Sequence, residues 1–98
     1  TAVFIFWDSY GGWYDPVPPP YVDEDGLGFR VPLLVISPYA KQGYVDHTHF
    51  EHGSILKFTE NQFGLGRLAA SDRRATSPDD AFDFSKAPRK FSPIKSSQ

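Results

Sequence analysis

Two apolar runs dominate the pattern of hydrophobic and polar positions along the chain. Residues 2–7 contain no polar side chain, and residues 31–36 are apolar at every position. A half-buried strand alternates apolar with polar side chains, whereas an uninterrupted apolar run is typical of a strand covered on both faces, as in parallel α/β sheets. We therefore predict an α/β fold with two strands, at about 2–7 and 31–36, in a parallel sheet.

A helix is predicted from about residue 50 to residue 63. Thr48 and Glu51 have the spacing of a capping box, so the helix should begin near them, and Gly64 is a common helix terminator. Ser77 is a second helix-start signal, because a proline and two acids follow it. The apolar stripe of the first helix consists of Ile55, Leu56, Phe58 and Phe63.

The connection between the two strands, residues 8–30, is long and carries eight glycines and prolines. Loops of this length are uncommon in compact domains unless they are functional or disordered. Asp8 follows the first strand, at the edge where α/β sheets bind ligands, although a solvated strand end is an equal alternative. Gly11 and Gly12 allow a turn with positive φ, or a close approach of the backbone to a ligand. We expect Arg30 to pair with Asp23 or Asp25.

All three histidines lie within six residues, beside two acids. Histidine is the commonest metal ligand and the commonest general acid or base. The spacing of His47, His49 and His52 does not match the His-Glu-x-x-His pattern of zinc proteases. The alternative is that these side chains cap or decorate the helix.

Composition and charge limit the partners. The chain has no Cys, so it has no disulfide and no thiolate chemistry, and no apolar run approaches the ~20 residues of a membrane helix. The net charge is −2, but residues 84–98 contain four basic residues and no acid. The remaining acidic body argues against nucleic acid as a partner. We interpret residues 86–98 as a basic extended tail, pinned to the body through Phe82, Phe84 and Phe91.

Two strands that are apolar on both faces need two covering layers, and the chain offers one good helix. We therefore expect an incomplete domain. The chain resembles the C-terminal part of the bacterial phosphoesterase family, which includes non-specific phospholipases C and acid phosphatases and has an alkaline-phosphatase-like fold. The resemblance spans residues 1–87 and rests on the blocks at residues 3–15, 17–20, 28–40, 47–48 and 53–58, with Asp83-Phe84 as the closing pair.

The resemblance implies a metal-dependent phosphoric-ester hydrolase, with residues 1–85 as the C-terminal portion of its domain. Asp8 matches the first acid of a metal-binding pair, whereas Ser9 stands where the family has Asp or Glu, and Pro16 where it tends to have His. It also implies catalytic roles for His47 and His52. The residues assigned to substrate binding are Gly11, Gly12, Tyr14 and Asp15.

Other parts implied by the resemblance are missing from these 98 residues. The family places an acid-amide metal motif and a nucleophilic hydroxyl upstream, and Ser54 does not match that nucleophile. We therefore expect the isolated chain to be inactive. The intact enzyme would use a divalent metal ion, act on a phosphomonoester or phospholipid, and be secreted or periplasmic. For this chain alone, the absence of any metal is the alternative.

Two alternatives remain open. The chain can be a non-catalytic remnant that acts as a structural or self-associating module, since the substitutions at Ser9 and Pro16 suit a degraded site. It can also bind a small ligand such as a sugar or a lipid headgroup through its aromatic side chains. The aromatics in question are Trp7, Tyr10, Trp13 and Tyr14.

Overall fold

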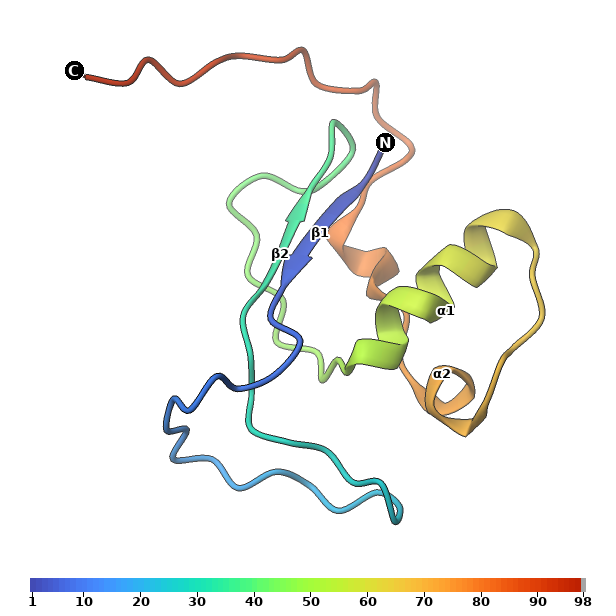
Figure 1. Ribbon diagram of the computed structural model, residues 1–98. Helices are drawn as coiled ribbons and strands as arrows, with labels where there is room; N and C mark the ends of the chain where they lie inside the picture. The colour runs from blue at the N-terminus through green and yellow to red at the C-terminus, as the bar shows by residue number, and fades with distance from the viewer. Residues whose placement is uncertain (98) are drawn as a thin grey trace.

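The computed structural model describes residues 1–97, which form two strands, two α-helices and one 3₁₀ helix (Figure 1). The elements in chain order are β1 (Val3–Phe6), β2 (Leu33–Ile36), α1 (His52–Phe63), α2 (Ala70–Arg74) and the 3₁₀ helix η1 (Pro78–Ala81). Both predicted strands and the predicted long helix are present, each slightly shorter than expected. The α/β fold class is confirmed.

The two strands form one antiparallel sheet, in which Val3 lies opposite Ile36 and Phe6 opposite Leu33. The prediction of a parallel sheet is therefore wrong. A parallel pair needs a crossover, usually through a helix, whereas the segment between β1 and β2 contains neither a helix nor a strand and simply reverses the chain. The apolar pattern of a strand predicts which of its faces are suited to burial. It carries no information on the direction in which the strand pairs with its neighbour.

The hydrophobic core lies between the sheet and α1. Phe58 of α1 stacks on Phe82, with ring centroids 4.9 Å apart, and Phe4 of β1 meets the edge of Phe58 at 5.3 Å. Ala40 is buried in the same cluster, and Val35 of β2 packs against it. Aromatic rings in these offset and edge-on arrangements attract one another beyond the burial of their area.

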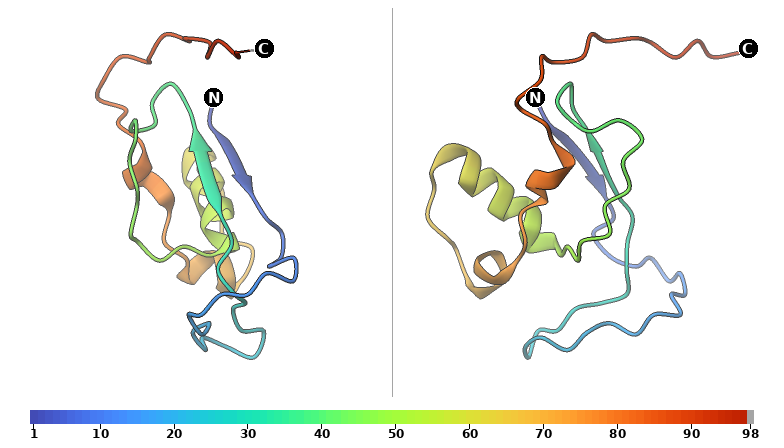
Figure 2. Two further views of the ribbon diagram at one scale, coloured as in Figure 1. Left: turned by 90° about the vertical axis from the view of Figure 1, so that its left-hand side faces the viewer. Right: turned by 180° about the vertical axis from the view of Figure 1, so that it is seen from behind.

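The opposite face of the sheet has no cover among residues 1–97. Successive side chains of a strand point to opposite faces, so the residues that alternate with Phe4 and Val35 point away from α1, which lies on one side of the sheet (Figure 2). These outward residues are Val3, Ile5, Leu34 and Ile36, and each is between 45% and 56% exposed. One covered face and one bare apolar face are consistent with a partial domain.

Helix α1 begins one turn later than the predicted capping box. The backbone N–H of Glu51, the N-cap residue, donates to Ser54 Oγ at 3.0 Å, so the residue that caps this backbone N–H is Ser54, and Thr48 is not part of the box. Ser54 is 1% exposed, which explains why its hydroxyl serves the helix end and is not presented to a substrate. Gly64 ends the helix in the left-handed conformation, with φ of 63°, as predicted.

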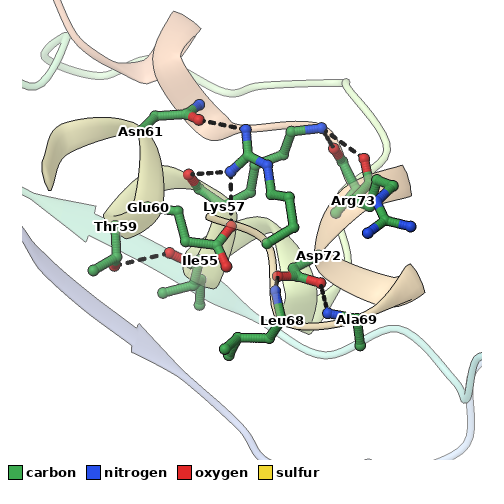
Figure 3. A network of polar contacts seen from close by, with 11 residues as sticks. Ile55, Lys57, Thr59, Glu60, Asn61, Leu68, Ala69, Asp72 and Arg73 are labelled. Atoms are coloured by element: carbon green, nitrogen blue, oxygen red, sulfur yellow. Dashed lines mark hydrogen bonds and ion pairs between the residues drawn. The ribbon is translucent and has the colours of Figure 1, made fainter. Parts of the chain in front are cut away.

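Polar contacts join α1 to α2 (Figure 3). Lys57 Nζ donates to the carbonyl oxygens of Arg73 and Ala75 at 2.9 and 2.7 Å and so satisfies the end of α2. The buried carboxylate of Asp72 accepts the backbone N–H groups of Leu68 and Ala69 at 2.6 and 2.8 Å. These two donors, that of Leu68 foremost, hold the pKa of Asp72 well below its usual value.

After α2 the chain returns to the hydrophobic core beside the sheet. Phe82 is buried and forms a bridge with Ala40, and Phe84 stacks on Phe82 with centroids 5.3 Å apart. Phe91 is 90% exposed, so its predicted role in pinning the tail is wrong. Residues 86–97 contain no helix or strand.

Candidate functional site

A large cavity, with a volume of about 830 Å³, opens beside the end of β1. Its walls come from the long loop between the strands, the first turn of α1, and α2. The charged or polar side chains that line it include Asp8, Ser9, Asp23, Asp25, Glu51, His52 and Arg74. The cavity therefore combines several carboxylates with one guanidinium and one imidazole.

The end of β1 and the start of α1 are joined directly. His52, the first residue of α1, has its Nε2 2.9 Å from the carbonyl oxygen of Trp7. A carbonyl oxygen only accepts, so Nε2 carries the proton and Nδ1 is left as the acceptor of the neutral ring. The imidazole also meets the edge of Phe6, with centroids 5.5 Å apart. This arrangement places His52 in the same cavity wall as Asp8.

Arg74 connects three parts of the cavity wall. Its Nε and Nη2 contact the carboxylate of Glu51 at 3.1 and 2.8 Å, and its Nη1 pairs with Asp23 in the loop between the strands. The carboxylates of Glu51 and Asp23 raise the pKa of Arg74, and the guanidinium lowers the pKa of Asp23. Nothing in the sequence pointed to this residue, because its partners lie 23 and 51 positions away.

The glycine turn after β1 has the predicted backbone conformation. Gly11 and Gly12 have φ of 64° and 83°, and the turn is closed by a hydrogen bond from the N–H of Trp13 to the carbonyl of Tyr10 at 3.1 Å. Neither glycine lines the large cavity, and Tyr14 is 84% exposed. The turn is thus present. Within residues 1–97, however, these residues do not line the cavity in which a substrate would bind, so their predicted role in substrate binding stays a prediction.

Asp15 joins the first part of the same loop to its last residue, Arg30. Its carboxylate accepts Nε and Nη2 of Arg30, both at 2.8 Å, as well as two backbone N–H groups. The guanidinium of Arg30, first, and the N–H of Val17 hold the pKa of Asp15 well below its usual value. The expected pairing of Arg30 with Asp23 or Asp25 is wrong, since Asp23 binds Arg74 instead.

The histidines separate in space. His47 and His49 are exposed and do not line the large cavity, whereas His52 does. The neighbouring Asp46 accepts the N–H of Thr48 at 2.9 Å, which makes a local turn. The structure therefore brings Asp8, Ser9 and His52 to one cavity and leaves His47 outside it.

The side chains of residues 1–97 do not by themselves fit a complete metal centre. No group of three or more His, Asp or Glu side chains in this part of the chain is placed to hold one ion. A hard cation takes six or more oxygen ligands, whereas Asp8 supplies one carboxylate and Ser9 only a neutral hydroxyl.

The aromatic side chains after β1 form a separate hollow of about 240 Å³. Trp7, Tyr10 and Trp13 line it together with Arg30.

None of the helices within residues 1–97 has the length and apolar character needed to cross a bilayer.

Residues 1–66 match the sequence model of the Phosphoesterase family. Among characterised proteins, the chain is 32% identical to non-specific phospholipase C1 of Arabidopsis thaliana, over 96% of this chain and 22% of that protein.

Two bacterial proteins are similar over a shorter stretch. Identity is 34% to a non-hemolytic phospholipase C of Burkholderia pseudomallei, over 64% of this chain and 13% of that protein. It is 35% to phospholipase C B of Mycobacterium tuberculosis, over 66% of this chain and 17% of that protein. The chain thus spans less than a quarter of the length of each of these relatives.

Proposed function

The chain belongs to the Phosphoesterase family, and on that premise we propose that it is the segment of a phosphoric-ester hydrolase that contributes Asp8 to an active-site metal ion. The observation that carries the proposal is the large cavity, in which Asp8 and His52 lie together at the end of β1. The remaining ligands and the nucleophile would come from outside these 98 residues. The metal would be divalent, and the ester a phosphomonoester or a phospholipid. Of these two substrate classes, the names of the relatives support the phospholipid.

The other residues have different degrees of support. His52 is placed in the cavity with one ring nitrogen already bonded to Trp7, so in this proposal Nδ1 is the atom that holds or moves a proton. The role of His47 rests on the family resemblance alone, as do those of Gly11 and Gly12. A secreted or periplasmic location belongs to the same proposal, and fractionation of the source cell tests it.

The contribution of Asp8 is tested by metal binding, which needs no turnover. Ser9→Glu restores an acidic pair and, because another carboxylate adds a charged ligand, should tighten Mn²⁺ binding by roughly tenfold or more in calorimetry. Ser9→Gln is the matched neutral control and should bind as the unaltered chain does. Asp8→Asn in the Ser9→Glu background should remove the gain. Equal affinities for the Glu and Gln variants would count against a metal site here.

The missing nucleophile is tested by an activity assay. We expect the pure chain to release no more nitrophenol from p-nitrophenyl phosphate than buffer does, with Mn²⁺, Ca²⁺ or Zn²⁺ present, because the buried Ser54 hydroxyl is engaged at the helix end. Phosphatidylcholine is the second substrate. Metal-dependent turnover of either one would show that these residues suffice.

A second candidate function is self-association of a non-catalytic remnant, and the bare face of the sheet favours it. Leu34 and Ile36 are more than half exposed, and an exposed apolar face beside unpaired strand edges promotes pairing between chains. Light scattering after size exclusion should then find a dimer that Leu34→Lys dissociates. Leu68→Lys, at an exposed residue away from the sheet, is the control. A monomer at high concentration excludes this function.

A further inference from the structure

The basic tail, of which the structure describes residues 86–97, is unlike the rest of the chain. It carries four cations and no acid, whereas residues 1–83 carry six cations and twelve acids. Phe91 and Ile94 within it are 90% and 96% exposed. Pro88 and Pro93 keep the backbone from forming a helix. The tail therefore presents charge and apolar side chains together, in an extended conformation.

The root of the basic tail is fixed to the body. The backbone N–H of Arg89 donates to the carbonyl of Pro38 at 3.0 Å, and its guanidinium donates to the carbonyls of Ser37, at 3.2 Å, and Ala40. Beyond Arg89 no hydrogen bond or ion pair within residues 1–97 involves the tail. Lys90, Phe91, Ile94 and Lys95 thus extend from a defined point and are free to meet a partner.

Lys41 is a further cation beside the root of the basic tail. It lines a hollow of about 380 Å³ together with Lys86 and Arg89 of the tail and with Asp83, which pairs with Lys86 at 3.6 Å. Figure 1 shows the tail leaving the molecule near the N-terminus, at the end opposite the long loop between the strands. Because Asp23 and Asp25 lie in that loop, the cationic and acidic ends of the molecule are separated.

We propose that the basic tail docks the chain on an anionic lipid surface. Lys and Arg side chains are attracted to anionic headgroups. Arg89 and Lys86 are engaged at the root of the tail, so Lys90 and Lys95 are the tail cations left to meet the headgroups, and the two exposed apolar side chains would enter the boundary between headgroups and acyl chains. Nucleic acid would use the same charges, but the aliphatic side chain of Ile94 has no ring on which a base can stack. A lipid surface accounts for both the cations and the apolar pair.

The charge separation makes this orientation favourable. Docking through the tail keeps the acidic loop away from the like-charged surface, where it would be repelled. The large cavity lies beside that loop, so the tail attaches the protein and does not deliver lipid into the cavity. The proposal therefore holds or fails independently of the proposed phosphoesterase function, and its test needs no activity.

The test is flotation of the full 98-residue chain with vesicles of phosphatidylcholine, with or without about one-third phosphatidylserine. We expect severalfold more protein on the anionic vesicles at low salt, and loss of that excess as salt screens the charges. Equal binding to both kinds of vesicle, or none, overturns the proposal. Tighter binding to a DNA duplex than to anionic vesicles at the same salt overturns it in favour of nucleic acid.

Matched variants separate the tail from overall charge. Lys90→Glu and Arg73→Glu change the net charge equally, and both sites are exposed, but only Lys90 lies in the tail. Lys90→Glu should reduce flotation severalfold and Arg73→Glu should not. Phe91→Ser should reduce flotation, with Leu68→Ser as its exposed apolar control. If each control loses as much binding as its partner variant, the tail is not the docking element.

Discussion

At the residue scale, the side chain that organises the cavity is Arg74. Its fork binds Glu51 at the start of α1 and Asp23 in the loop between the strands, while its own backbone ends α2. A planar guanidinium can serve two carboxylates at once, which a lysine ammonium cannot do in the same geometry. One side chain therefore fixes the loop, the helix start and α2 relative to one another.

This geometry predicts the effect of Arg74→Lys. The charge is kept but the fork is lost, so the loop around Asp23 and the backbone near Glu51 should open more often. Amide hydrogen exchange followed by mass spectrometry should show severalfold faster exchange in both segments. Arg73→Lys, at the exposed neighbouring position, is the control and should leave exchange there unchanged. Identical exchange in the two variants would show that Arg74 does not hold the wall.

The candidate site was only partly predictable at this scale. The glycine turn and the position of Asp8 follow from short-range signals, namely an apolar run, an acid and two glycines, and the structure shows the turn. The pairing of Arg30 with Asp15 could not be foreseen, because Asp23 and Asp25 lie nearer to Arg30 in the sequence than Asp15, which is 15 positions away. Only the folded loop decides which carboxylate the guanidinium reaches.

At the scale of elements, the contact between α1 and α2 depends on Gly53. A Cβ added there would lie 2.8 Å from the backbone oxygen of Ser71, closer than atoms can approach. Gly53→Ala should therefore push the helices apart and lower the free energy of unfolding by about 1 to 3 kcal/mol, despite the better helix propensity of alanine. Urea denaturation measures the loss.

Gly66→Ala is the matched control for this prediction. A Cβ at Gly66 meets no atom within 4 Å, and its φ is not positive, so the change should be neutral or slightly stabilising. If the two variants unfold at the same urea concentration, the approach of α1 to α2 does not limit stability.

The existence of the elements was easier to predict than their arrangement. The strands, the helix and its Gly64 terminus were correct because each depends on residues close in sequence. The capping box lies one turn later than predicted, with Glu51 as the N-cap residue and Ser54 as its partner, because the pair Thr48 and Glu51 and the pair Glu51 and Ser54 have the same spacing and tertiary burial selects the second pair. The direction of strand pairing depends on the path of a long loop, which local patterns do not encode.

At the scale of the whole molecule, the sheet is covered on one side only. The fully buried hydrophobic residues are few, and α1 is the one long helix within residues 1–97. A small core supplies little free energy, so charged and backbone-capping contacts carry a larger share of stability. Five of those contacts involve aspartates whose pKa values are lowered in the folded chain: Asp15, Asp23, Asp46, Asp72 and Asp83.

These lowered pKa values predict acid sensitivity. An aspartate with a depressed folded pKa binds fewer protons in the native state than in the unfolded state, so its stabilisation is present above the unfolded pKa of about 4 and is lost as the pH falls toward the folded value. The urea midpoint should therefore decline steeply between about pH 4 and pH 2.

Asp72→Asn tests the contribution of one such aspartate. It should lower the midpoint at neutral pH, because one backbone donor loses its acceptor, and it should make the decline shallower, because one titrating group is gone. Glu24→Gln, at an exposed loop carboxylate, should retain the full decline. A midpoint that stays constant or rises on acidification would mean that these aspartates do not stabilise the fold.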